Sequence, residues 1–183
     1  MRVLGIDPGS IRTGFSVLES SEKQHFYIAS GTIFLDEKLS LAQKLLQLSH
    51  DLRKILNNYR PTDLALENIF FAKNAQSALK LGHARGVVLM QAAGMGLKIF
   101  EYSPTEVKHS LCGRGRADKD EVAQMAKFLL RFPKTFNFKT PDESDAVAIG
   151  LAHLQTKRLK LFQKASSSKD STHDRATFWQ TEL

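Results

Sequence analysis

Four carboxylates stand next to apolar segments of this sequence, at positions where an acidic side chain is unexpected unless it has a structural or chemical role. Asp7 ends the apolar run of residues 3–6, and Glu67 ends a second apolar run. Asp142 and Asp145 are three residues apart at the head of a late amphipathic segment, which puts both on one face of a helix. Like charges gathered in one place are unfavourable unless a cation joins them. Mg²⁺ prefers oxygen ligands, so the four acids predict a site for a hard divalent metal.

Three of the four acids also have an ordinary structural explanation, which the sequence leaves open. Asp7 can cap the tight turn that follows it, and Glu67 can face solvent from an edge strand. Asp142 can cap its helix and interact with the helix dipole. Asp145 precedes the tightly packing run of residues 146–152 and is harder to place as plain surface. A helix that brings both aspartates to the ends of two strands would assemble an oxygen-rich metal site.

Glycines and cations in two segments are suited to a phosphate. Gly9 and Gly14 let the backbone come close to a phosphate or a metal. Residues 113–116, Gly-Arg-Gly-Arg, precede a helix start and offer mobile cations and free amides to a phosphate, although an ordinary solvated loop explains them equally well. The candidate cations of this region are Lys108, Arg114, Arg116 and Lys119.

Two aromatic residues next to a lysine follow the second carboxylate. Phe70 and Phe71 precede Lys73 in a predicted turn, and exposed aromatics beside a cation can stack on nucleic-acid bases. Burial in the core is the more frequent outcome for a phenylalanine, but two adjacent aromatics at a turn seldom bury together. We therefore expect one of the two to be exposed, and either can be that one.

The composition describes a basic soluble domain. The chain has 183 residues, of which 42% are hydrophobic and 25% are charged. Its formal net charge of +7 favours a polyanionic partner such as nucleic acid, with solubility alone as the other explanation. Cys112 is the single cysteine, so no intramolecular disulfide can form and a reducing compartment fits. Asp7 interrupts the first apolar run and residues 86–97 are too short to span a bilayer, so we expect a cytoplasmic protein without a secretory signal.

Apolar periodicity predicts an α/β fold. Apolar runs bounded by turn residues predict five strands, at residues 3–6, 14–18, 26–34, 64–67 and 98–102. Helical spacing and capping residues predict five helices, at about residues 40–58, 74–95, 103–113, 118–131 and 142–161. Strands first, followed by helices alternating with strands, indicate a mixed sheet with helices on both faces.

The domain is predicted to cover residues 1–155, and residues 156–183 hold the end of the last helix and a basic tail. Residues 165–183 are rich in Ser, Thr, Lys and Asp, which predicts a disordered or loosely attached segment. Ala78, Gly82 and Gly86 lie four residues apart on one helix face. Small residues at that spacing permit close helix packing, within the fold by default or across a dimer.

Together these motifs resemble the RuvC family of Holliday-junction resolvases, the crossover junction endodeoxyribonucleases. The resemblance covers about residues 2–155, and its blocks stand in one order and spacing, which makes it highly specific. The matching blocks are residues 4–10 with Thr13 and Gly14, residues 67–74, residues 77–82 with 84–86, Tyr102, residues 107–108, residues 113–115 with Ala117 and Lys119, and residues 142–146 with Ala148, Ile149 and His153.

The resemblance implies an RNase H-like fold with a mixed five-stranded sheet and a homodimer joined through the helix of residues 74–95. It implies that the four acids are catalytic and bind two Mg²⁺ ions, which Mn²⁺ can replace. Four-way junction DNA is the implied substrate, and the branch-migration proteins RuvA and RuvB are implied partners. Phe70 matches the family's junction-probing aromatic. The expected DNA contacts are Phe70, Lys73, Lys108, Arg114, Arg116 and Lys119.

The predicted function is a Mg²⁺-dependent endonuclease that resolves Holliday junctions in recombination and DNA repair. Asp7 is expected to bridge two metals about 3.5–4 Å apart, with Glu67, Asp142 and Asp145 completing the sites. Two equivalent sites in a C₂ dimer would make paired symmetric nicks in a junction of near two-fold symmetry.

Three other functions remain open at this point. An actin-like ATPase or sugar kinase also begins with Asp-x-Gly, but that fold generally needs two such domains and leaves Glu67 and the Asp142/Asp145 pair without a shared role. A non-catalytic junction-binding module would use the acids structurally. An RNase H-like nuclease with another substrate would share every catalytic residue.

Overall fold

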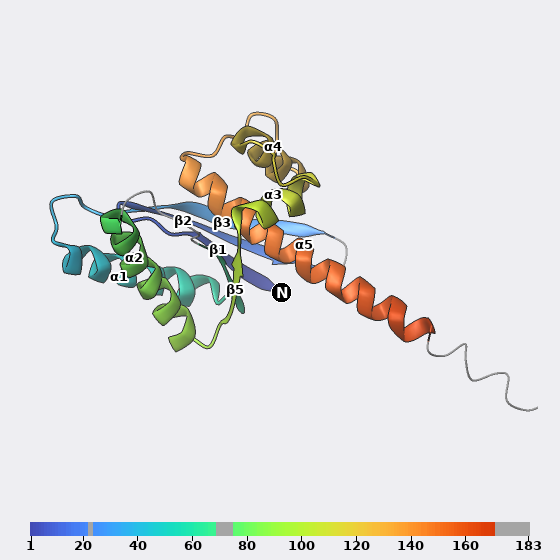
Figure 1. Ribbon diagram of the computed structural model, residues 1–183, viewed down its shortest axis with the longest axis horizontal. Coiled ribbons are helices and arrows are strands. Elements are labelled where there is room, and N and C mark those ends of the chain that lie inside the picture. Colours follow the sequence, from blue (N-terminus) through green and yellow to red (C-terminus); the bar gives the residue numbers. More distant parts are fainter. Residues whose placement is uncertain (22–23, 69–74, 171–183) are drawn as a thin grey trace, which may run out of the picture.

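A five-stranded sheet and five helices form the part of the chain that the structure describes (Figure 1). The structure, a computed structural model, describes residues 1–21, 24–68 and 75–170. All the predicted strands and helices are present. The strands are β1 (Arg2–Asp7), β2 (Arg12–Ser20), β3 (His25–Phe34), β4 (Asp63–Glu67) and β5 (Lys98–Tyr102). The helices are α1 (Leu41–Tyr59), α2 (Ala75–Gly94), α3 (Pro104–Cys112), α4 (Lys119–Leu129) and α5 (Pro141–Asp170).

The sheet is mixed, as predicted. Its strand order is β3-β2-β1-β4-β5. The first three strands form an antiparallel meander, while β4 pairs in parallel with both β1 and β5. The carboxyl ends of β1, β4 and β5 therefore meet at one edge of the sheet. Asp7, at the end of β1, and Glu67, at the end of β4, lie at this edge.

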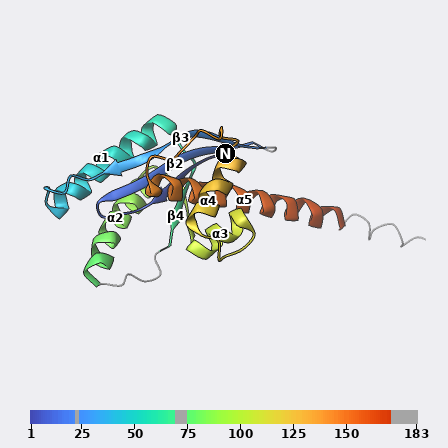
Figure 2. The same cartoon turned by 90° about the horizontal axis from the view of Figure 1, so that it is seen from above.

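Helices cover both faces of the sheet, which confirms the predicted layering (Figures 1 and 2). Successive strand residues point to opposite faces. In β1, Leu4 and Ile6 pack in the cluster that includes the buried face of α1, whereas Val3 packs in the cluster that contains α3, α4 and α5. The sheet thus has two hydrophobic cores, and α5 belongs to the second.

Helix α5 lies directly against the backbone of β1 and β2. A Cβ atom on Gly5 would stand 2.4 Å from the carbonyl oxygen of Ala146, and one on Gly14 would stand 1.9 Å from that of Asp142. The hydroxyl of Ser16 donates to the same Ala146 carbonyl at 2.7 Å. The interpretation of Gly14 as a place for a phosphate or metal is wrong, because the start of α5 fills that space.

The space beside Gly9 is filled as well. A Cβ atom there would stand 2.0 Å from the carbonyl oxygen of Arg12. Thr13 holds this turn closed, since its hydroxyl donates to the Gly9 carbonyl at 3.2 Å. The phosphate interpretation of Gly9 is therefore also wrong, and both glycines serve close packing of the chain on itself.

Capping boxes begin the short helices next to the sheet edge. Ser103 and Glu106 cap α3 reciprocally, with Pro104 in the first turn, as predicted. Asp118 and Glu121 do the same for α4, where the Asp118 side chain accepts from the Glu121 amide at 2.8 Å. These caps fix where the two helices start, and so where Lys108 of α3 and Lys119 of α4 lie.

The last helix differs from the prediction at its end. It runs to Asp170 rather than to residue 161, so the first residues of the segment predicted to be a disordered tail are helical. The serines and lysines of residues 164–169 lower apolar periodicity without breaking a helix, because neither glycine nor proline occurs among them. Residues 171–183, and the predicted cap Asn74 of α2, lie outside the described residues. No helix in the described ranges has the length and apolarity needed to cross a membrane.

Replacing Gly14 with alanine tests the packing of α5. The added Cβ meets the backbone of Asp142, which cannot rotate away, so we expect Gly14→Ala to lower the free energy of unfolding by about 3 kcal/mol or more. The matched control is Gly94→Ala, since no described atom lies within 4 Å of a Cβ there, and we expect it to change stability by less than about 1 kcal/mol. Urea unfolding of both variants measures the difference, and equal stability would contradict the packing argument.

Candidate active site

Asp7 and Glu67 stand side by side at one edge of the sheet. The parallel pairing of β1 with β4 aligns Ile6 with Leu66. The next residue of each strand is the carboxylate, and neighbouring strands are about 4.8 Å apart. Both side chains are partly buried. The pairing of two apolar strands thus brings together two acids that are 60 residues apart in the sequence.

The first turns of α5 bring Asp142 and Asp145 to the same edge. Asp7 pairs with Gly14 across β1 and β2, and the Asp142 carbonyl lies where a side chain of Gly14 would be. Asp142 is therefore close to the end of β1. Asp145 follows one turn later on the same helix face.

The pKa values of the strand-end acids show that the four carboxylates share one electrostatic environment. The pKa of Asp7 is raised from 3.8 to about 7, chiefly by burial and then by the negative charges of Glu67, Asp145 and Asp142 in that order, while Lys119 opposes them. Burial also raises the pKa of Glu67, followed by the charge of Asp145. The structure therefore brings the four predicted acids together in a place with excess negative charge.

Two predicted lysines face this cluster. Lys119, the first residue of α4, donates from Nζ to Oδ2 of Asp145 at 2.7 Å. This hydrogen bond is the main reason why the pKa of Lys119 is raised, and the charges of Asp7 and Glu67 contribute as well. Lys108 of α3 lowers the pKa of Glu67 through its charge. The capped starts of α3 and α4 thus supply cations to the edge where the strands supply acids.

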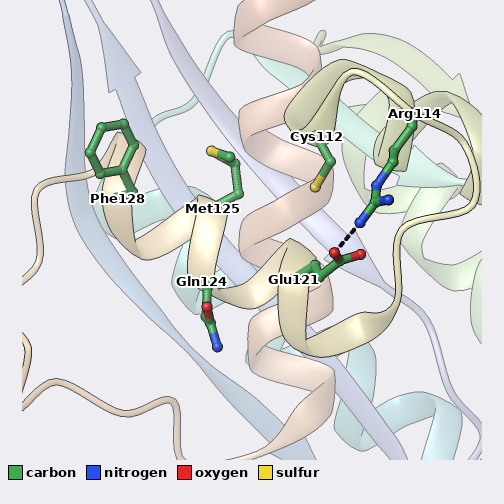
Figure 3. Close-up of a pocket in the computed structure, with 6 residues that line it drawn as sticks. All are labelled: Cys112, Arg114, Glu121, Gln124, Met125 and Phe128. Carbon is green, nitrogen blue, oxygen red and sulfur yellow. Dashed lines mark hydrogen bonds and ion pairs between the residues drawn. The ribbon is translucent and has the colours of Figure 1, made fainter.

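The other predicted DNA contacts are placed differently. Arg114 forms an ion pair with Glu121 beside a pocket that Cys112, Met125 and other residues line, so it points toward α4 (Figure 3). Its guanidinium remains largely exposed, as does Arg116. Phe70, Phe71 and Lys73 lie outside the described residues. DNA contact by these residues stays a prediction.

Glu143 is a positioning residue that the motif analysis did not single out. It is buried, and its carboxylate accepts from the hydroxyl of Ser30 at 2.6 Å and from the backbone amide of Lys139 at 2.6 Å. The bond to Ser30 holds the start of α5 against β3. The bond to Lys139 holds the end of the segment that connects α4 to α5. The signal in the sequence is weak, because an acid between two other acids in a first helical turn reads as a solvated cap.

Arg85 was also missed as a separate candidate. One guanidinium nitrogen donates to the backbone carbonyl of Glu67, and another pairs with Glu101 at 2.7 Å. Arg85 therefore ties α2 to the end of β4 and fixes the backbone from which the Glu67 side chain extends. An arginine among the small and apolar residues 84–90 of the predicted helix was the available signal.

A buried polar network anchors the middle of α5. His153 is completely buried and hydrogen-bonds Tyr102 at 2.8 Å and Asp63 at 2.9 Å. Burial raises the pKa of Tyr102 to about 12, with further contributions from Glu106 and Asp63, so this tyrosine keeps its proton. The network joins α5 to β4 and β5 and so helps to hold the helix against the sheet.

The four carboxylates suit a hard divalent cation in chemistry and in charge. All their donors are oxygens, and burial together with neighbouring carboxylates raises the pKa of Asp7, an effect that Lys119 does not fully balance. Within the described ranges, however, no three His, Cys, Asp or Glu side chains are grouped closely enough to hold one ion. The backbone places the four carboxylates at one edge of the sheet. To bind an ion, their side chains would have to rotate toward one another, and Lys119 would have to release Asp145.

Comparisons of sequence identify relatives of this chain. The family described as "Crossover junction endodeoxyribonuclease RuvC" matches residues 3–153. A RuvC of that description from Pelobacter propionicus is 38% identical over 180 residues, which are 98% of each chain. One from Sorangium cellulosum is 44% identical over 154 residues, which are 84% of each chain.

Comparisons of structure agree with those of sequence. Thermus thermophilus RuvC is 29% identical with a TM-score of 0.80, covering 87% of this chain and 97% of its own. The same protein in complex with Holliday junction substrate gives a TM-score of 0.81 at 28% identity, covering 87% of this chain and 96% of its own. The yeast mitochondrial Holliday junction resolvase Ydc2, 16% identical with a TM-score of 0.65 over 91% of this chain and 83% of its own, shares the fold. The predicted RNase H-like sheet is thereby confirmed, and the chain belongs to the RuvC family of crossover junction endodeoxyribonucleases.

Proposed function

We propose that this protein resolves four-way DNA junctions by metal-dependent hydrolysis of phosphodiester bonds, with the acid cluster as its active site. The observation that carries the proposal is the meeting of Asp7, Glu67, Asp142 and Asp145 beside Lys119 at one sheet edge, in a chain of this family. The cluster gives the four acids a shared role, which an actin-like ATPase would not.

Asp7, Glu67, Asp142 and Asp145 would hold two Mg²⁺ ions, which Mn²⁺ can replace. Bound metal supplies Lewis-acid stabilisation of the charge on the reacting phosphate and lowers the pKa of a water. Asp7 must release its proton to act as a ligand. Lys119 and Lys108 would donate to phosphate oxygens and neutralise developing charge.

A homodimer is part of the proposal, and an exposed face of α2 supports it. Leu79 and Met90 are 65% and 59% exposed, and no described atom lies within 4 Å of a Cβ built on Gly82 or Gly86. The default expectation that these glycines pack inside the fold is therefore wrong for the described residues. A C₂ dimer through α2 would offer two equivalent sites for paired nicks.

The setting of the reaction rests on the family resemblance. We propose RuvA and RuvB as partners in branch migration and the cytoplasm as the location. The Thermus thermophilus relative in complex with Holliday junction substrate supports the choice of DNA. Residues 1–155 are proposed as the nuclease domain.

Asp7→Asn separates catalysis from binding. With a synthetic mobile four-way junction and Mg²⁺, we expect the wild-type protein to make paired symmetric nicks and Asp7→Asn to lose cleavage by about 10³-fold or more, because removing a carboxylate weakens the metal site. Junction affinity should stay within about threefold of wild type. Asp51→Asn on α1, which changes the same charge far from the site, is the control and should cleave normally.

Each alternative function gives a different result in that assay. Junction binding without cleavage by the wild-type protein in Mg²⁺ or Mn²⁺ would indicate a non-catalytic module. Equal cleavage of linear duplex and junction would indicate another RNase H-like nuclease.

Protonation of Asp7 links stability to pH. Asp7 binds its proton up to about pH 7 in the metal-free fold but only to its ordinary pKa of 3.8 when unfolded. The folded chain therefore holds more protons between these values, and its free energy of unfolding falls as pH rises through them. At pH 8 we expect Asp7→Asn to be more stable than wild type by about 2–4 kcal/mol, and at pH 4 to show almost no difference. Denaturant unfolding in EDTA at both pH values measures this, and lower stability of the variant at pH 8 would contradict it.

Glu143→Gln tests positioning of α5. The amide nitrogen that replaces one carboxylate oxygen donates and does not accept, so the side chain can no longer accept from both Ser30 and the Lys139 amide, and we expect a loss of about 1–3 kcal/mol in stability. We also expect a cleavage rate about tenfold lower with unchanged junction affinity. Glu37→Gln, an exposed site in a turn, is the control, and cleavage at the wild-type rate by a destabilised Glu143→Gln would refute the positioning role.

A further inference from the structure

A second pocket continues from the acid cluster along α4. It has a volume of about 280 Å³ and lies between α4, the connection to α5 and the first turns of α5. Lys119 and Asp145 belong both to its wall and to the acid cluster. The pocket and the acid cluster are therefore adjacent and share these two side chains.

The pocket is positively charged beyond the part that belongs to the acid cluster. Lys119, Lys127 and Lys139 face two acids, Asp120 and Asp145, and the second acid is already paired with Lys119. Lys127 donates from Nζ to the Asn137 side chain at 2.9 Å, and this nitrogen is 5.8 Å from the ring centre of Phe138. Two lysines thus reach a hollow that a phosphate can enter.

The wall of the pocket is preorganised. In the segment that connects α4 to α5, the rings of Phe132 and Phe136 stack with their centroids 3.8 Å apart. The ring of Tyr27 in β3 contacts that of Phe132 edge-on, with a centroid distance of 4.9 Å. The backbone amide of Lys139 donates to buried Glu143 at 2.6 Å. Since these contacts hold the connection in place, little conformational entropy is lost when a ligand binds.

We propose that this pocket binds a backbone phosphate of the cut DNA strand next to the scissile one, with Lys127 and Lys139 as its cationic groups. The inference rests on the proposed function, because that function supplies the DNA strand at the acid cluster. The pocket would hold the strand on one side of the cut, so that the scissile phosphate is presented to the carboxylates in a fixed register.

The salt dependence of junction binding tests this proposal. A lysine that contacts a phosphate contributes about one to the slope of log K against log salt concentration. We expect Lys139→Gln to reduce that slope by about one, to weaken binding about tenfold at low salt, and to do so alike for junctions of different sequence. The assay is fluorescence anisotropy with a four-way junction in EDTA, between 50 and 500 mM NaCl (roughly one decade of salt).

Matched variants keep the test decisive. Lys98→Gln at the start of β5, the opposite end of that strand from the acid edge, should leave slope and affinity unchanged. Lys127→Gln should reduce the slope and the affinity as Lys139→Gln does. Lys127→Arg keeps the positive charge, so it should bind the junction like the wild-type protein even though its contact with Asn137 differs. Unchanged slope and affinity in both glutamine variants would overturn the pocket assignment while wild-type cleavage still stood. Absence of junction cleavage by the wild-type protein would instead overturn the proposed function.

Discussion

The direct contact of α5 with the backbone of β1 and β2 is the constraint on which the rest of the site depends. Only glycine fits at positions 5 and 14, because the carbonyls of Ala146 and Asp142 occupy the space of a side chain. The Ser16 hydrogen bond, the buried Glu143 carboxylate and the His153 network hold the helix in that contact. As a result, two aspartates of α5 reach the strand ends that carry the other two acids.

The same packing creates an electrostatic conflict. Burial and neighbouring carboxylates raise the pKa of Asp7 to about 7, so the metal-free cluster keeps a proton on that acid. Lys119, the lysine that is hydrogen-bonded in the cluster, interacts chiefly with Asp145. A divalent ion would remove the conflict by taking the place of the proton. Structural stability is thus reduced at the place where the chemistry is proposed, a pattern common at functional sites.

Much of this arrangement follows from the sequence because it depends on local patterns. Apolar runs gave the strands, and a carboxylate at the end of a run marked Asp7 and Glu67. The capping boxes at Ser103 and Asp118 predicted where α3 and α4 start, and so where Lys119 lies.

What the sequence did not reveal depends on contacts between distant segments. Gly14 was interpreted as room for a ligand, because nothing local shows that the backbone of Asp142 fills that space. The roles of Glu143 and Arg85 depend on partners in distant segments, which are Ser30 of β3 for the first and the Glu67 carbonyl at the end of β4 for the second. The end of α5 was missed because polar residues weaken the apolar pattern without ending a helix.

We propose that the four acids form a cation site and that a bound cation displaces the proton of Asp7. Calorimetric titration of the protein with Mg²⁺ at pH 6, in buffers of different ionisation enthalpy, measures the protons released on binding. We expect nearly one proton to leave each wild-type site and almost none to leave the site of Asp7→Asn, because Asp7 is largely protonated at that pH. Mg²⁺ binding without proton release, or equal release by both proteins, would contradict it.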